Sequence, residues 1–271
     1  MSDVALSRLV SDKDISTRLY LQLCDLKDAI LIDERRKGDL FRCVVEIMRK
    51  LETVKYHRDN LLKRVSEEMR VRGGTRNEEI CYIVDLTTGV EKEFEAFLMQ
   101  GKACLDVLVK ILQPLFQVKL HSYGHGGTKV IKALRKNLPP AELQLAENLI
   151  CLIENDREWI GKWFKDERDT VTHYRAIVSS GFVTTPRSAE GESRHLGPAL
   201  MDGTPFCQAV SVLYHNLLTF CEDFIPLAVS VNFPKGILLR LIPEGERDAE
   251  YPRKYGMVLN RAEVTPGTGA T

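Results

Sequence analysis

The chain has no net charge, no long apolar run and no apolar core typical of a signal peptide near its N-terminus. Its 38 basic and 38 acidic residues cancel, so no global field draws the protein onto nucleic acid or an anionic membrane. Any nucleic-acid site must therefore be a local patch. The most apolar stretch, Leu217 to Val231, contains two acidic residues and a proline, which excludes a membrane-spanning helix there. We expect a soluble protein with no membrane partner.

Cysteine pairs of the Cys-x-x-Cys type are also lacking. The seven cysteines lie singly, mostly inside apolar runs, at positions 24, 43, 81, 104, 151, 207 and 221. An odd, scattered set of this kind favours reduced, buried thiols over a disulfide framework. We therefore expect a cytoplasmic location.

The sequence has no Walker loop, no serine nucleophile elbow, no dinucleotide fingerprint and no Cys/His ligand set. His121 and His125 are the nearest approach to a metal pair. Glycines at 124 and 126 disfavour a regular helix there, and no third ligand is close in the sequence. We expect no metal and no cofactor.

Apolar residues at helical spacing dominate what is present. Residues 12–36 carry an apolar face at steps of three and four, and a second helix follows a break at Gly38 and runs towards Met69. Two long antiparallel helices joined by a short turn predict an N-terminal helical hairpin. The apolar positions of the first helix are Ile15, Leu19, Leu23, Leu26 and Ile30.

Helical patterning continues beyond the glycine-containing stretch Val71 to Thr75, which we take as a boundary. The further helices are expected at Asn77 to Leu112, Thr128 to Asn137, Ala141 to about Trp163, and Phe206 to Val229, with a short strand at Ile177 to Val183.

The character of the sequence changes after residue 230. Two apolar runs, Ile237 to Ile242 and Tyr255 to Leu259, flank a charged turn and predict a small β-hairpin, and a polar tail expected to be disordered ends the chain. The predicted fold is mostly α: a helical bundle with an N-terminal helical hairpin and a small C-terminal β-hairpin. We divide it into residues 1–72, 73–230 and 231–271.

An arginine and a histidine five positions apart, Arg168 and His173, follow an aromatic helical run that includes Trp159 and Trp163. Cleavage of RNA by its own 2′-hydroxyl needs a base for the hydroxyl proton and a cation for the charge that builds on phosphate. A neutral imidazole near its pKa suits the first task and a guanidinium the second. Asp169 could orient either group, or favour the imidazolium form of the histidine.

This segment resembles the Arg-x-x-x-x-His signature of the HEPN family of helical domains, over residues 77–230 at most. The family position after the arginine is usually a small polar residue, often Asn, where this chain has Asp169. The resemblance implies a helical bundle and a metal-independent endoribonuclease of a microbial defence or toxin system. His173 would be the general base, Arg168 the phosphate clamp and Asp169 the orienting partner.

Five positions along an α-helix place two side chains roughly 140° apart. Arg168 and His173 can therefore converge only if the arginine precedes the regular helix, or if two copies meet. The resemblance implies the second solution, a homodimer in which two motifs line one cleft. The two tryptophans are most simply core or dimer-interface residues.

A basic strip on residues 128–137 provides a local patch for RNA. Lys129, Lys132, Arg135 and Lys136 share one helical face, downstream of a glycine-rich loop that could cradle an anion at the helix N-terminus. The simpler interpretation is a solvated charged face.

Two alternatives remain open for the motif itself. Arg168 could pair with Asp166 or Glu167 on a solvated face while His173 is a partly buried helix residue, which would leave a plain helical scaffold. Alternatively, a catalytically silent HEPN-like bundle could bind RNA or a partner protein, the latter through the N-terminal hairpin.

Overall fold

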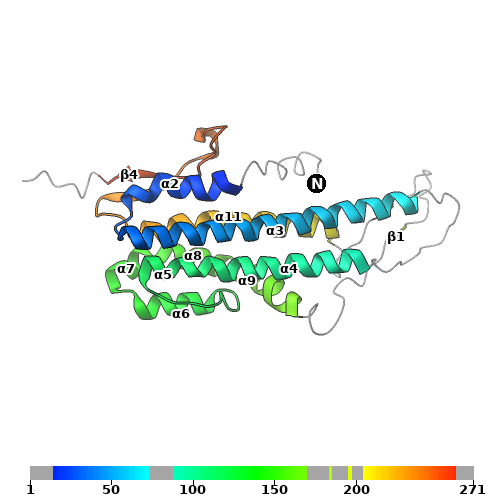
Figure 1. Ribbon diagram of the computed structural model, residues 1–271, viewed down its shortest axis with the longest axis horizontal. Coiled ribbons are helices and arrows are strands. Elements are labelled where there is room, and N and C mark those ends of the chain that lie inside the picture. Colours follow the sequence, from blue (N-terminus) through cyan, green and yellow to red (C-terminus); the bar gives the residue numbers. More distant parts are fainter. Residues whose placement is uncertain (1–14, 74–87, 170–182, 185–194, 197–203, 261–271) are drawn as a thin grey trace, which may run out of the picture. The chain divides into compact units, whose positions relative to one another are not determined.

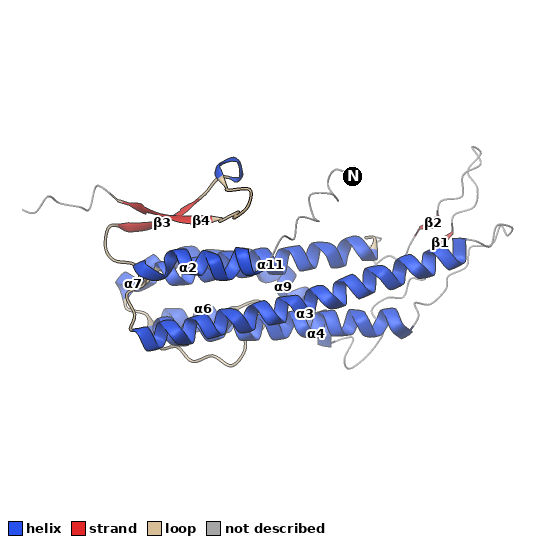
Figure 2. Cartoon of the chain, turned by 45° about the horizontal axis from the view of Figure 1, so that its top comes forward, coloured by secondary structure: helices blue, strands red, loops and turns tan. Residues whose placement is uncertain are grey.

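The structure, a computed structural model, describes residues 15–73, 88–169, 183–184, 195–196 and 204–260. It confirms a mostly helical chain with a small antiparallel sheet near the C-terminus (Figure 2). The longer helices are α3 (Glu34–Gly73), α4 (Thr88–Leu108), α6 (Thr128–Asn137), α8 (Glu147–Asn155) and α11 (Phe206–Ser230). The short helical segments are η1 (Thr17–Leu21), α2 (Gln22–Leu26), η2 (Lys27–Ala29), η3 (Val109–Ile111), α5 (Leu112–Phe116), α7 (Pro140–Leu145), α9 (Arg157–Gly161), η4 (Lys162–Glu167) and η5 (Glu244–Glu246).

The chain forms two compact units, each assembled from separate segments. Unit 1 comprises Met1–Arg49, Cys104–Trp159 and Leu218–Thr271, and unit 2 comprises Lys50–Ala103 and Ile160–Leu217. The long helices α3, α4 and α11 (Figure 1) each contribute residues to both units. The division of the chain into residues 1–72, 73–230 and 231–271 remains a prediction.

The predicted helix break at Gly38 is wrong, because α3 begins at Glu34 and passes through Gly38. Its start is fixed by Asp33, whose carboxylate accepts a hydrogen bond from the backbone N–H of Arg36 at 2.9 Å. A side-chain oxygen in this position satisfies one of the N–H groups left free at a helix start. The chain turns just before it, where Ile30 is extended.

The single helix predicted from Ala141 to about Trp163 is divided into α7, α8, α9 and η4, with breaks at Ala146 and Asp156. At the second break the Asp156 carboxylate accepts a hydrogen bond from the indole N–H of Trp159 at 2.6 Å. The Trp159 ring also lies edge-on to Phe220, with ring centres 6.4 Å apart. This tryptophan therefore packs inside unit 1 and holds the turn between two helices.

The predicted β-hairpin is confirmed as β3 (Ile237–Leu241) paired antiparallel with β4 (Tyr255–Leu259). The strand expected from Ile177 lies outside the described residues except for Val183, which belongs to β1 (Val183–Thr184) and pairs with β2 (His195–Leu196). The expected disordered tail from Thr265 also lies outside them. Within the described part of the chain, every helix is too short or too polar to cross a membrane.

Candidate functional site

Arg168 follows a π-helical turn in unit 2. The segment η4 winds as a π-helix over Lys162–Glu167, and Arg168 continues it in a right-handed helical conformation. Such π turns are rare within helices and are found frequently at functional sites. The sequence pattern, which assumes α-helical winding, gives no sign of this turn.

The packing of Phe164 positions this turn. The Phe164 side chain is fully buried, and its ring centre lies 6.5 Å from that of Phe97 on α4. Its ring also lies against Gly101, where an added Cβ would come within 2.8 Å of three ring carbons. Gly101 therefore allows the close approach that sets the position of η4, and so of Arg168 one turn later.

Asp169 links two cations that precede it in the sequence. One of its carboxylate oxygens accepts a hydrogen bond from a terminal nitrogen of Arg168, and the other pairs with the ammonium group of Lys165. The ion pair of Arg168 is therefore with Asp169, not with Asp166 or Glu167 as the solvated-face alternative expected. This contact agrees with the orienting role assigned to Asp169, which itself stays a prediction.

The guanidinium of Arg168 is only partly accessible, since 26% of its side chain is exposed. Its Nε atom is buried and has no hydrogen-bond acceptor within the described part of the chain. A buried N–H group without an acceptor costs free energy, about 1–3 kcal/mol, and calls for a specific explanation. The predicted base, His173, lies outside the described residues, so its convergence with Arg168 stays a prediction.

Helix α6 confirms the expected amphipathic pattern. Val130, Ile131 and Leu134 are buried in unit 1. The four basic residues of the predicted strip, which are Lys129, Lys132, Arg135 and Lys136, are all exposed. Arg135 pairs with Glu154 at 3.3 Å, with both side chains about half exposed. The strip thus belongs to unit 1, whereas Arg168 and Asp169 belong to unit 2.

The glycines before α6 are needed for the path of the backbone. Gly124, Gly126 and Gly127 all have positive φ angles. A Cβ on Gly127 would also come within 2.8 Å of the buried hydroxyl of Tyr123. Packing therefore explains these glycines without an anion at the helix N-terminus.

No group of three or more potential metal ligands occurs among the side chains that the structure describes. His121 and His125, the pair weighed as zinc ligands, are both exposed on the loop before α6.

A further polar cluster in unit 2 has no counterpart in the sequence patterns. The Nδ1 atom of His57 on α3 lies 2.8 Å from a carboxylate oxygen of Glu93 on α4, and Arg64 approaches the other oxygen at 3.7 Å. A carboxylate at Nδ1 fixes the orientation of an imidazole ring and leaves Nε2 as its second polar atom. Thirty-six residues separate the pair, so no local spacing could indicate it.

Comparison with protein-family models, curated proteins and solved structures gives no match to this chain. The likeness to the HEPN family therefore depends on the residues around Arg168 and His173 alone.

Proposed function

We propose that the chain is a metal-independent endoribonuclease that cuts RNA through attack by the RNA's own 2′-hydroxyl. The observation that carries the proposal is the contact between Arg168 and Asp169 directly after a π-helical turn. A carboxylate on one side of a guanidinium fixes its direction, and preorganised donors of this kind stabilise charge that develops on phosphate. Arginine also keeps its charge at every working pH.

The proposed chemistry needs two groups. His173, assigned from the sequence, removes the proton of the 2′-hydroxyl, and the resulting oxyanion attacks the neighbouring phosphorus. The bond to the 5′-oxygen breaks, that oxygen gains a proton, and a 2′,3′-cyclic phosphate remains on the other fragment. Arg168 stabilises the phosphoryl oxygens during the attack, and Asp169 holds the guanidinium in place.

The exposed face of α6 is the proposed RNA-binding surface. Lys129, Lys132 and Lys136 are exposed and α6 anchors the strip rigidly through its buried residues. Because the whole chain has no net charge, a local strip of this kind must supply the phosphate contacts. By resemblance, the proposed setting is a cytoplasmic defence or toxin system in which the enzyme acts as a homodimer.

A second candidate function is a catalytically silent helical module that binds a partner protein. It is favoured by two large apolar side chains that are exposed in the N-terminal part of unit 1, namely Leu21 at 37% and Leu31 at 66%. Binding of a partner protein would remove such apolar surface from water.

The two candidates are separated by incubating purified protein with single-stranded RNA in EDTA and analysing the ends produced. The proposed enzyme cuts without metal and leaves a 2′,3′-cyclic phosphate. A requirement for magnesium, or a 5′-phosphate product, would contradict the mechanism. An absence of cleavage together with capture of a protein through the N-terminal helices would favour the silent module.

A further inference from the structure

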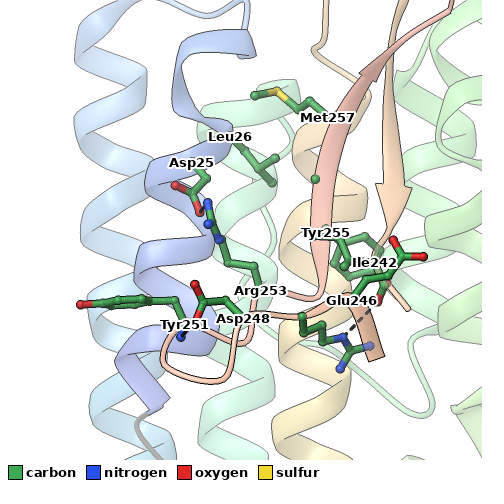
Figure 3. A pocket seen from close by; sticks show the side chains of 11 residues that line it. Asp25, Leu26, Ile242, Glu246, Asp248, Tyr251, Arg253, Tyr255 and Met257 are labelled. Carbon is green, nitrogen blue, oxygen red and sulfur yellow. Dashed lines mark hydrogen bonds and ion pairs between the residues drawn. The ribbon is translucent and has the colours of Figure 1, made fainter. Parts of the chain in front are cut away.

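A cavity of about 350 Å³ lies within unit 1, between α2 and the C-terminal hairpin (Figure 3). Residues of α2, of β4 and of the turn between the two strands line it. Pockets that hold small molecules usually measure about 300–1,000 Å³ and combine apolar walls with a few polar groups. The cavity therefore has the size of a small-molecule site, and it shares no residue with the proposed ribonuclease site.

Polar contacts hold the walls of this cavity in place. The buried side chain of Gln22 on α2 accepts hydrogen bonds from the backbone N–H groups of Lys254 and Tyr255 at 3.0 and 2.9 Å. It also donates to the carbonyl of Tyr255 at 2.8 Å, and the Tyr255 hydroxyl donates to Asp223 on α11 at 2.9 Å. Because these walls are already fixed, a ligand binds without the cost of ordering them.

Part of the lining is apolar or aromatic, and some of it is open to water (Figure 3). Leu26 is buried, whereas Tyr251 is 50% exposed and Met257 is 40% exposed. A ligand in the cavity would cover such apolar surface, which is favourable. Aromatic rings pair well with other rings in offset or edge-on geometries. The lining therefore fits a ligand with a flat aromatic body.

Gly256, inside β4, keeps space open in the wall. Its φ angle is outside the left-handed region, so the backbone does not require glycine there. Within the described structure an added Cβ would meet only Ile242, at an ordinary 3.5 Å, so packing does not require glycine either. Glycine weakens the interior of a strand and often marks a place that a ligand approaches closely. Since Ile242 also lines the cavity, the missing side chain leaves room for a ligand.

The carboxylates of the lining already have partners. Asp25 pairs with Arg253 at 3.2 Å, and Glu246 pairs with Arg240 at 3.0 Å. Asp248 accepts hydrogen bonds from two backbone N–H groups of the turn, at 2.8 and 3.3 Å. A cationic ligand would have to compete with these partners.

Arg247 is the charged group that remains to meet a ligand. Its Nε atom donates to the carbonyl of Ile242 at 3.0 Å, which fixes the side chain. Its terminal nitrogens have no acceptor within hydrogen-bonding distance among the residues that the structure describes. Burial and Asp223 raise the pKa of Tyr255, and the charge of Arg247 opposes this rise, so the guanidinium lies near that tyrosine. A planar fork with free donors matches a carboxylate or a phosphate.

We propose that this cavity binds a small aromatic anion. Its carboxylate or phosphate group lies on the terminal nitrogens of Arg247, and its ring packs against Leu26 and Tyr251. The proposal is independent of the proposed ribonuclease activity, because every group involved belongs to unit 1 and the test measures binding alone.

Titration of the ¹⁵N-labelled chain with benzoate and with phenyl phosphate, followed by two-dimensional NMR, tests the proposal. Both should bind with a dissociation constant on the order of 1 mM, ordinary for ligands of about ten non-hydrogen atoms. The amide signals of Leu26, Arg247 and Gly256 should shift. The tighter of the two ligands identifies the preferred acidic group. Benzamide has the shape of benzoate without its charge and should bind at least about tenfold more weakly.

Arg247→Gln should weaken the binding of both anions at least about tenfold. Arg42→Gln is the matched control, since it removes the same charge from a 79% exposed side chain of unit 1 that does not line the cavity. Gly256→Ala should also weaken binding, because it narrows the cavity and leaves its charges unchanged. The signals of β3 and β4 in the same spectra show whether the hairpin stays folded in each variant.

Three results would overturn the proposal. The first is an absence of shifts at the lining amides up to about 10 mM of either anion. The second is equal binding of benzoate and benzamide. The third is unaltered affinity in Arg247→Gln.

Discussion

The ring of Phe164 occupies the space that a side chain at Gly101 would need. Phe164 belongs to the π-helical turn before Arg168, and Gly101 lies in the middle of α4. A glycine inside a helix ordinarily costs about 0.5–1 kcal/mol relative to alanine. At Gly101 this cost is offset by the burial of an aromatic ring against the bare backbone.

Gly101→Ala should therefore destabilise the protein, although alanine is the better helix former. The new methyl group overlaps the Phe164 ring, and such overpacking costs about 1–3 kcal/mol. Urea denaturation followed by circular dichroism measures the change. If the chain is a ribonuclease, cleavage should fall as well, because η4 and Arg168 must shift.

Gly38→Ala is the matched control for this prediction. Gly38 also lies inside a helix, but an added Cβ there meets no atom within 4 Å. The substitution should raise the free energy of unfolding by about 0.4–1 kcal/mol. A loss of stability at Gly38, or a gain at Gly101, would contradict the packing argument.

The elements predicted correctly are those whose pattern is local. Thr128–Asn137 is amphipathic along its whole length, and the two strands of the hairpin are short apolar runs around a charged turn. Breaks inside helical patterns were not predictable in this way. Glycine disfavours the interior of a helix, yet α3 begins before Gly38, at the cap that Asp33 provides, and continues through it.

The contacts of the candidate site also separate into local ones, which the sequence predicts, and long-range ones, which it does not. Arg168 and Asp169 are adjacent in the sequence, so a contact between their side chains could be expected from the sequence. The pairing of His57 with Glu93 depends on how α3 packs against α4, and that packing has no local signature. Gln22 likewise looks like an ordinary surface residue until β4 lies beside it.

Arg168→Lys should lower RNA cleavage at least about 100-fold, the loss typical when one stabilising donor is removed. Lysine keeps the charge but loses the planar fork that can bond Asp169 and a phosphate together. Asp169→Asn should cause a smaller loss, since it leaves the guanidinium in place but less firmly held. Single-turnover cleavage rates measure both, and near-normal activity in Arg168→Lys would mean that the clamp assignment is wrong.

Charge reversal on α6 should weaken RNA binding. Lys132→Glu combined with Arg135→Glu removes two cations from the exposed strip, so fewer counterions are released on binding. The salt dependence of the affinity should flatten by about 0.7 per lost phosphate contact for single-stranded RNA. Fluorescence anisotropy at several salt concentrations measures this, with exposed Lys119→Glu as the control. An unchanged salt slope would identify the strip as a solvated face.

Gln22→Leu should loosen the C-terminal hairpin. The substitution leaves the backbone groups of Lys254 and Tyr255 without partners, at about 1–3 kcal/mol for each group that stays buried. Amides of β4 should then exchange with solvent deuterium faster than those of α11. Gln113→Leu, at an exposed position, should leave exchange unchanged. Full protection of β4 in Gln22→Leu would show that other contacts hold the hairpin.

Ionisation of Asp156 should lower the free energy of unfolding as the pH rises above the ordinary pKa of an aspartate. Burial raises the pKa of Asp156, Asp223 raises it further, and the hydrogen bond from Trp159 lowers it. Because the folded state binds the proton more tightly than the unfolded state, the stabilisation is present below the unfolded pKa, near 3.9. It is lost as pH rises through the folded pKa.

Asp156→Asn tests this sign. An asparagine keeps an oxygen for the Trp159 indole but carries no charge, so the variant should be more stable than the unaltered chain at pH 7. Thermal unfolding from pH 3 to pH 7 should show a flatter pH dependence in the variant. A variant that is less stable at pH 7 would mean that the ionised carboxylate is favourable in the fold.

The continuity of α3, α4 and α11 through both compact units has a consequence for cooperativity. Unfolding one unit alone would cut each of these helices, and every new helix end leaves four backbone groups without partners. Because that cost arises in three helices at once, neither unit should melt by itself. Heating should give a single calorimetric transition, and a ligand bound to one unit should raise the melting temperature of the other.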